Sequence, residues 1–213
     1  MKEKTVTSAI GWFFEKIILL IVRGLALSKI HPNVLTFIGL LINIGAAALL
    51  AAGQFRWAGV VIIGAGLFDM VDGRVARETN RVTRFGGFFD SVLDRYSDLF
   101  LLMGLLVWYG SINLPFYVVL TAVVMTGSVM VSYTRARAEN SIPTCKVGFM
   151  ERPERVVLLI IGALFDRFPE VLWVIAVLAN LTVVQRMVFT WQEAQRLEEA
   201  QLRPPTVARR AKA

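Results

Sequence analysis

Cysteine and histidine are almost missing from this sequence, which contains Cys145 and His31 as its only examples among 213 residues. A single cysteine cannot build a disulfide framework, and it argues for neither a thiolate metal site nor a redox role. We therefore expect Cys145 to be an ordinary small loop residue. Charge is scarce as well, since Asp, Glu, Lys and Arg together account for 18% of the chain. That is too little for the polar surface of a soluble domain of this size.

The chain is instead rich in apolar residues, which make up 56% of it, and its mean hydropathy is +0.60. Such a composition is typical of a membrane protein. We predict an all-α integral membrane protein with six transmembrane helices, because a bilayer requires about 20 apolar residues per span. The six apolar segments are 32–53, 56–77, 86–109, 114–137, 152–165 with a few flanking residues, and 170–190.

The segment 1–30 differs from these spans, because charged residues interrupt its apolar positions at a helical rhythm. This pattern favours an amphipathic helix on the membrane surface. A true span is the alternative, and the interior charges of Glu15, Lys16 and Arg23 count against it. No clear cleavage site follows the first lysines, so we expect the segment to be retained. The predicted organisation is therefore a juxtamembrane helix at 1–30, a six-helix catalytic domain at 31–192 and a polar cytoplasmic tail at 193–213.

Basic residues predict the orientation in the membrane. With a cytoplasmic amino terminus, the external loops hold only Arg56 and Arg167 of the 23 Lys and Arg residues. The positive-inside rule favours this topology. Both termini and the loop from Arg135 to Arg155 then face the cytoplasm of a cell membrane.

Four aspartates, Asp69, Asp72, Asp90 and Asp94, stand in an otherwise oily part of the chain. An ionised Asp at bilayer depth costs about 2.5 to 3.5 kcal/mol on insertion scales, so such acids are read as functional by default. Residues three or four apart share a helix face, so these acids predict two acidic faces on two helices. Facing each other, they would form a carboxylate cage. Hard oxygen ligands of this kind suit Mg²⁺ or Mn²⁺ rather than zinc.

Two simpler explanations of the acids remain open. A di-iron carboxylate bundle needs a Glu-x-x-His pair, and the single histidine lies outside this region. The acids could also merely pair with neighbouring arginines, which explains one acid better than four on two faces. Those arginines are Arg74, Arg77, Arg81, Arg84 and Arg95.

The acidic stretch also carries a family resemblance. It reads D-x-x-D-G-x-x-A-R and, eight residues later, G-x-x-x-D-x-x-x-D. Every fixed position of the CDP-alcohol phosphotransferase signature is filled, and a motif of this length is a strong signal. The resemblance implies transfer of a phosphatidyl or similar group from a CDP-linked lipid to an alcohol, with release of CMP. It also implies a homodimer.

The same resemblance implies roles for individual residues. Asp69, Asp72, Asp90 and Asp94 correspond to ligands of two divalent metal ions, and Asp94 also corresponds to the base that activates the acceptor hydroxyl. The positions that hold the CDP moiety in relatives are Pro32, Asn33, Val34, Leu35, Gly73, Arg77 and Thr83.

A second polar group, in the strings SYTRARAE and ERPERV and around Arg186, resembles the branch of the family that uses inositol phosphate. The resemblance implies that Ser132, Arg135, Arg137, Arg152 and Arg186 bind the phosphate of the acceptor. Guanidinium groups suit that task through charge-assisted, bidentate hydrogen bonds. Glycerol 3-phosphate would suit much the same arginines and remains the second candidate acceptor.

Two further alternatives stay open. The arginines could be ordinary cytoplasmic-end residues facing anionic lipid, with Glu151 and Arg155 paired across one helical turn. A small cation channel or transporter would use the acids as an ion path, but here they lie toward one end of their helices rather than at the midplane where such sites usually sit.

Overall fold

The computed structural model describes residues 31–78 and 82–202, except for the side chains of residues 71–76, 78, 201 and 202. Within this part the chain is helical and contains no strand. Its helices are α2 (Pro32–Ala51), α3 (Phe55–Glu78), α4 (Arg84–Ser111), α5 (Pro115–Ala138), α6 (Arg152–Phe165) and α7 (Phe168–Leu202). Each of the six predicted segments is thus a helix. The amphipathic helix predicted at 1–30 lies outside the described residues.

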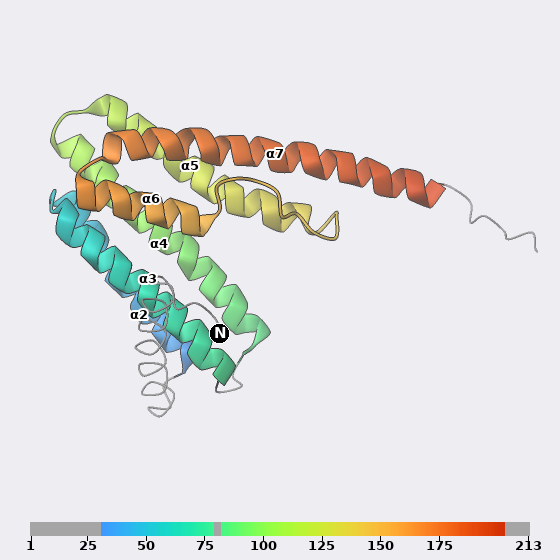
Figure 1. Ribbon diagram of the computed structural model, residues 1–213, viewed down its shortest axis with the longest axis horizontal. Coiled ribbons are helices and arrows are strands. Elements are labelled where there is room, and N and C mark those ends of the chain that lie inside the picture. The colour runs from blue at the N-terminus through green and yellow to red at the C-terminus, as the bar shows by residue number, and fades with distance from the viewer. Residues whose placement is uncertain (1–30, 79–81, 203–213) are drawn as a thin grey trace, which may run out of the picture.

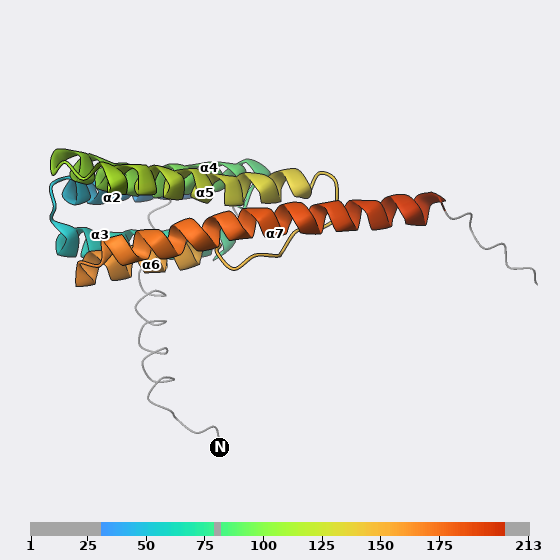
Figure 2. The same cartoon turned by 90° about the horizontal axis from the view of Figure 1, so that it is seen from above.

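The helices form two layers that close into a ring. Figure 2 shows α2, α4 and α5 in one layer and α3, α6 and α7 in the other. Within the layers α4 packs against α2 and α5, and α6 packs against α3 and α7. Contacts of α2 with α3 and of α5 with α7 join the layers. The ring therefore surrounds an interior that the helices can line with side chains from several directions.

Short local signals in the sequence begin the helices. His31 precedes α2 and its Nδ1 accepts a hydrogen bond from the backbone N–H of Asn33, while Pro32 opens the helix. Thr83 caps α4 by accepting from the backbone N–H of Gly86 at 2.9 Å. At α6, the side chains of Glu151 and Glu154 form a capping box. Each cap satisfies backbone donors that the first helical turn leaves without a partner.

The interior of the ring is apolar over most of its length. Leu50, Ile62, Leu105 and Leu172, from four different helices, are each at most 1% exposed. Large apolar side chains also cover the outside, as Trp57, Val119, Val177 and Met187 illustrate with more than half of their surface exposed. An apolar exterior of this extent marks a surface that is covered by lipid or by another protein.

Three helices, α2, α5 and α7, are each long and apolar enough to cross a membrane. Together with the apolar exterior, they support the prediction of an integral membrane protein. The turns that carry Arg56 and Arg167 lie at the same end of the bundle as the turn between α4 and α5 (Figure 1). α7 is longer than predicted, because residues 193–202 of the predicted polar tail continue it as helix.

Candidate active site

Three of the four predicted acids meet where α3 faces α4. Asp69 on α3 and Asp90 and Asp94 on α4 each offer a carboxylate oxygen within 4.8 Å of the other two, and all three side chains are half-buried. The fourth acid, Asp72, has a side chain outside the described part of the chain. Three carboxylates at this spacing repel one another in a poorly solvated site, so they require a cation. Their hard oxygen donors fit Mg²⁺ or Mn²⁺.

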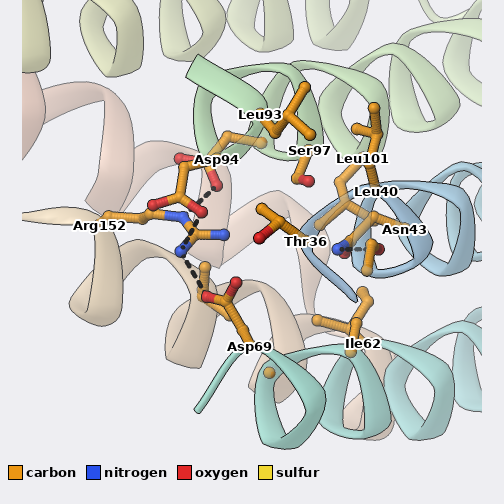
Figure 3. A pocket seen from close by; sticks show the side chains of 15 residues that line it. Thr36, Leu40, Asn43, Ile62, Asp69, Leu93, Asp94, Ser97, Leu101 and Arg152 are labelled. Atoms are coloured by element: carbon orange, nitrogen blue, oxygen red, sulfur yellow. Dashed lines mark hydrogen bonds and ion pairs between the residues drawn. The ribbon is translucent and has the colours of Figure 1, made fainter. Parts of the chain in front are cut away.

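A cation from a distant part of the sequence reaches the same acids. Arg152, the first residue of α6, places Nη1 2.8 Å from Asp69 Oδ2 and 2.8 Å from Asp94 Oδ1. Figure 3 shows its guanidinium between these two carboxylates. Of the neighbouring arginines considered above, Arg77 and Arg84 are exposed, and Arg95 bonds to Ser91 of its own helix. The counter-charge recorded for these acids therefore comes from another helix.

Asp98 is a further acid of the site, one helical turn beyond Asp94. Its Oδ1 lies 3.4 Å from Nε of Arg152, and its Oδ2 lies 2.8 Å from Nη2 of Arg155. Asp98 and Arg155 are 5% and 3% exposed. Asp98 therefore joins the acidic cluster to the buried face of α6. The sequence analysis did not single it out, although it continues the four-residue spacing of Asp90 and Asp94.

The acceptor residues predicted on α5, α6 and α7 converge in part. Arg135 Nη1 and Arg186 Nη2 bind the same carboxylate oxygen, Glu151 Oε1, at 3.1 and 3.0 Å. Arg137 is exposed, so Arg135 is the member of the pair that faces this group, while Ser132 on the same helix is half-buried. The suggested pairing of Glu151 with Arg155 is wrong, because Arg155 pairs with Asp98 and Glu151 with the arginines of α5 and α7.

Arg186 is 1% exposed, which is unusual for a charged side chain within an apolar helix. Its Nε donates to the backbone carbonyl of Val147 at 2.9 Å, and its Nη1 donates to that of Val131. The residue thereby ties the loop between α5 and α6 to both α5 and α7. Burial with full hydrogen bonding removes most of the cost of placing a charge there.

Gly148 brings the same loop against α7. Its φ of +120° disfavours any residue with a Cβ, and a Cβ would collide with the side chain of Thr182. Thr182 Oγ1 accepts from the backbone N–H groups of Phe149 and Met150 at 3.2 and 3.1 Å. These contacts fix the chain immediately before Glu151 and Arg152. The loop is therefore a supporting part of the site.

The residues predicted for the CDP moiety gather at the starts of α2 and α4. Pro32 and Leu35 are buried, Asn33 is half-buried, and Val34 is exposed. A Cβ on Gly86 would lie 3.4 Å from Asn33 Oδ1, so the two helix starts are close. Of the remaining predicted residues, Thr83 caps α4 and Arg77 is exposed, whereas the side chain position of Gly73 is outside the described part.

Residues 29–194 match the model of the CDP-alcohol phosphatidyltransferase family. The chain belongs to this family. Among curated relatives, it is 35% identical to the archaetidylinositol phosphate synthase of Pyrococcus horikoshii, over 83% of this chain and 90% of the relative. It is 36% identical to the phosphatidylinositol phosphate synthase of Mycobacterium tuberculosis, over 84% and 87%. The family predicted from the aspartate signature is confirmed.

Solved structures of the M. tuberculosis synthase are similar as well. A crystal structure with CDP-diacylglycerol bound superposes with a TM-score of 0.77 at 34% identity, covering 83% of this chain and 94% of that one. A complex of that enzyme with manganese and citrate gives a TM-score of 0.75 at 34% identity, covering 82% and 88%. The fold of this CDP-alcohol phosphatidyltransferase is thus that of a relative that binds a CDP-linked lipid and, separately, manganese.

Proposed function

We propose that this enzyme transfers the phosphatidyl group of CDP-diacylglycerol to inositol phosphate, giving phosphatidylinositol phosphate and CMP. The observation that carries the proposal is the acidic cluster of Asp69, Asp90 and Asp94 at one end of a helical bundle, with the start of α6 and its arginines beside it. The relatives named above support the choice of inositol phosphate within the family.

Asp69, Asp90 and Asp94, together with Asp72, would hold Mg²⁺ or Mn²⁺, with two ions as the proposed number. When bound, the metal neutralises charge that develops on the departing CMP. The remaining work falls to the chain. The starts of α2 and α4, with Asn33, Thr83 and Gly86, would receive the CDP moiety, because the two helix starts are close and Gly86 leaves bare backbone beside them.

Asp94 is the proposed general base. The acceptor hydroxyl attacks the phosphorus that carries the diacylglycerol, its proton passes to a carboxylate oxygen of Asp94, and the bond from that phosphorus to CMP breaks. One oxygen of Asp94, Oδ1, lies 2.8 Å from Arg152 Nη1, so the arginine fixes the direction of the carboxylate. A positioned base of this kind contributes about 10²- to 10⁴-fold to a rate.

Glu151 supports an acceptor-phosphate site at Arg135 and Arg186. Its Oε1 marks a point at which one anionic oxygen contacts both guanidinium groups, at 3.1 and 3.0 Å. A phosphomonoester carries close to two negative charges near neutral pH and competes well for such a pair. Arg152, adjacent to Glu151 in the chain, would supply the third cation, and Ser132 a hydroxyl.

The proposed setting is a cell membrane crossed by all six helices, with the acidic cluster toward the cytoplasm. The turns with Arg56 and Arg167 then lie outside, in agreement with the positive-inside rule. A homodimer is part of the proposal. The acyl chains of the donor would remain in the bilayer, along the apolar exterior, while the head group reaches the site.

The acceptor is tested by measuring CMP release with inositol phosphate, glycerol 3-phosphate and free inositol at equal concentrations. We expect inositol phosphate to be the fastest substrate and free inositol to be inactive, because the arginine group requires an anion. A preference for glycerol 3-phosphate would assign the other phosphorylated acceptor. Use of free inositol, or ion transport without CMP release, would contradict the proposal.

Arg135→Ala and Arg137→Ala form a matched pair on α5. Loss of a charged hydrogen-bonding partner costs about 1.5 to 3 kcal/mol, so Arg135→Ala should raise the KM for inositol phosphate roughly ten- to a hundredfold. Arg137 is exposed, and its removal should change this KM by no more than about twofold. Initial rates at varied acceptor concentration decide between them. Equal effects of the two substitutions would place the phosphate elsewhere.

A further inference from the structure

We infer that Asp98 is a positioning residue for Arg152, and through it for the phosphate of the acceptor. The inference rests on the proposed function for its effect on the acceptor. Its geometric part concerns only residues of this chain, Asp98, Arg152 and Arg155, and can be tested separately.

Arg152 is held along two edges of its guanidinium group. Nη1 contacts Asp69 and Asp94 at 2.8 Å each, and Nε lies 3.4 Å from Asp98 Oδ1. A flat guanidinium that is bound at Nε and at Nη1 cannot rotate about its long axis without losing one of these contacts. The Asp98 contact comes from below the acidic cluster, because Asp98 is one turn deeper in α4 than Asp94. Asp98 therefore determines the direction in which Arg152 presents its remaining nitrogen, Nη2.

Asp98 is itself fixed by a buried partner. Its Oδ2 lies 2.8 Å from Nη2 of Arg155, and the side chains of the two residues are 7% and 4% exposed. Within the described part of the chain, Arg155 Nε and Nη1 and the nearby Ser128 Oγ are buried without a hydrogen-bond partner. All three residues line one small cavity between α4, α5, α6 and α7. The ion pair thus gives Asp98 a fixed place, although Arg155 is incompletely satisfied.

Stability alone is a poor reason for this arrangement. A buried ion pair is often no more stable than well-packed apolar residues of similar volume, because its desolvation offsets its attraction. The unpartnered nitrogens of Arg155 make the balance less favourable still. An arrangement that does not maximise stability but places Asp98 Oδ1 against Arg152 is explained by its effect on Arg152. The site also keeps three carboxylates around one guanidinium, so the third contact specifies direction more than charge.

The first test is Asp98→Asn, measured with a double-mutant cycle. We expect the KM for inositol phosphate to rise roughly tenfold, since one charged contact of Arg152 is lost, while the KM for CDP-diacylglycerol stays within about twofold. In an Arg152→Ala background, Asp98→Asn should have no further effect on the acceptor KM, because Asp98 acts through Arg152. Additive effects in the cycle, or equal losses for both substrates, would reduce Asp98 to a structural role and overturn the inference.

Asp98→Asn alone leaves Arg155 charged and buried, which can prevent folding. The double variant Asp98→Asn, Arg155→Met removes both charges of the pair and should fold while still lacking the contact to Arg152. It should show the same rise in acceptor KM. A normal acceptor KM in this folded variant would also overturn the inference. Asp166→Asn, an exposed Asp at the turn between α6 and α7, is the matched control with unchanged kinetics.

A readout without catalysis separates this inference from the proposed function. Phenylglyoxal modifies accessible arginines, and peptide mass spectrometry follows the rate at Arg152. We expect Asp98→Asn to accelerate modification of Arg152 severalfold and Asp166→Asn to leave it unchanged. An unchanged rate in Asp98→Asn contradicts the positioning role, whatever the acceptor is. Faster modification in an enzyme that rejects inositol phosphate would retain the positioning role and overturn only the proposed acceptor.

Discussion

Asp94→Asn is expected to lower the rate of CMP release by about 10²- to 10⁴-fold, the range typical of a positioned general base. Asparagine keeps the shape of the side chain but cannot take the proton of the acceptor hydroxyl. Asp94 is also a predicted metal ligand, so some of the loss will reflect weaker metal binding. Turnover with CDP-diacylglycerol and inositol phosphate is the measurement, accompanied by binding of CDP-diacylglycerol to the variant, which we expect to persist.

The control for Asp94→Asn is again Asp166→Asn, which makes the same chemical change at the opposite end of the bundle. Its turnover should equal that of the unmodified enzyme. Near-normal turnover of Asp94→Asn would mean that another group takes the proton. Loss of lipid binding together with turnover would instead assign Asp94 to the donor site.

Chelation is expected to abolish activity altogether. Asp69, Asp90 and Asp94 hold oxygens within 4.8 Å of one another, and a single arginine contact to two of them does not replace a multivalent cation at such a site. CMP release in EDTA should fall to the level measured without enzyme, and added Mg²⁺ or Mn²⁺ should restore it. Zinc should restore it poorly, because the acidic cluster offers no nitrogen or sulfur ligand.

A binding measurement complements the chelation experiment. Mn²⁺ bound to the purified protein can be counted by its paramagnetic resonance signal, which also tests the proposed number of two ions. Asp69→Asn should weaken this binding, and Asp166→Asn should not. Full activity in the presence of chelator would exclude the acidic cluster as a metal-dependent catalytic site.

The sequence predicted the helices well, because long apolar segments bounded by Pro32, Pro115 and other breaks carry strong local signals. The end of α7 was missed, since residues 193–202 are polar and an apolar segment could predict only the part within the bilayer. The meeting of Asp69, Asp90 and Asp94 was also predictable, because helical spacing placed the acids on two narrow faces and the family resemblance indicated that these faces meet.

The partners of the arginines were harder to predict. Arg152 contacts Asp69 across 83 residues and Asp98 across 54, and no local spacing indicates such contacts. Glu151 was considered only as a neighbour of Arg155 on the same helix, whereas the structure gives it to Arg135 and Arg186. Pairing between helices depends on how they are rotated and ordered in the ring, which periodicity within one helix does not determine.

The short α6 has a consequence for how the two substrates arrive. Its 14 residues rise about 21 Å, less than the hydrocarbon thickness of about 30 Å. With the turn between α6 and α7 at the outer face, Arg152 at the start of α6 then lies below the inner surface of the bilayer. The acceptor descends to it from water, while the donor reaches it by lateral diffusion and never leaves its leaflet. The enzyme thus works at an interface between two phases, and its speed follows the mole fraction of CDP-diacylglycerol among the surrounding lipids rather than its concentration in the total volume.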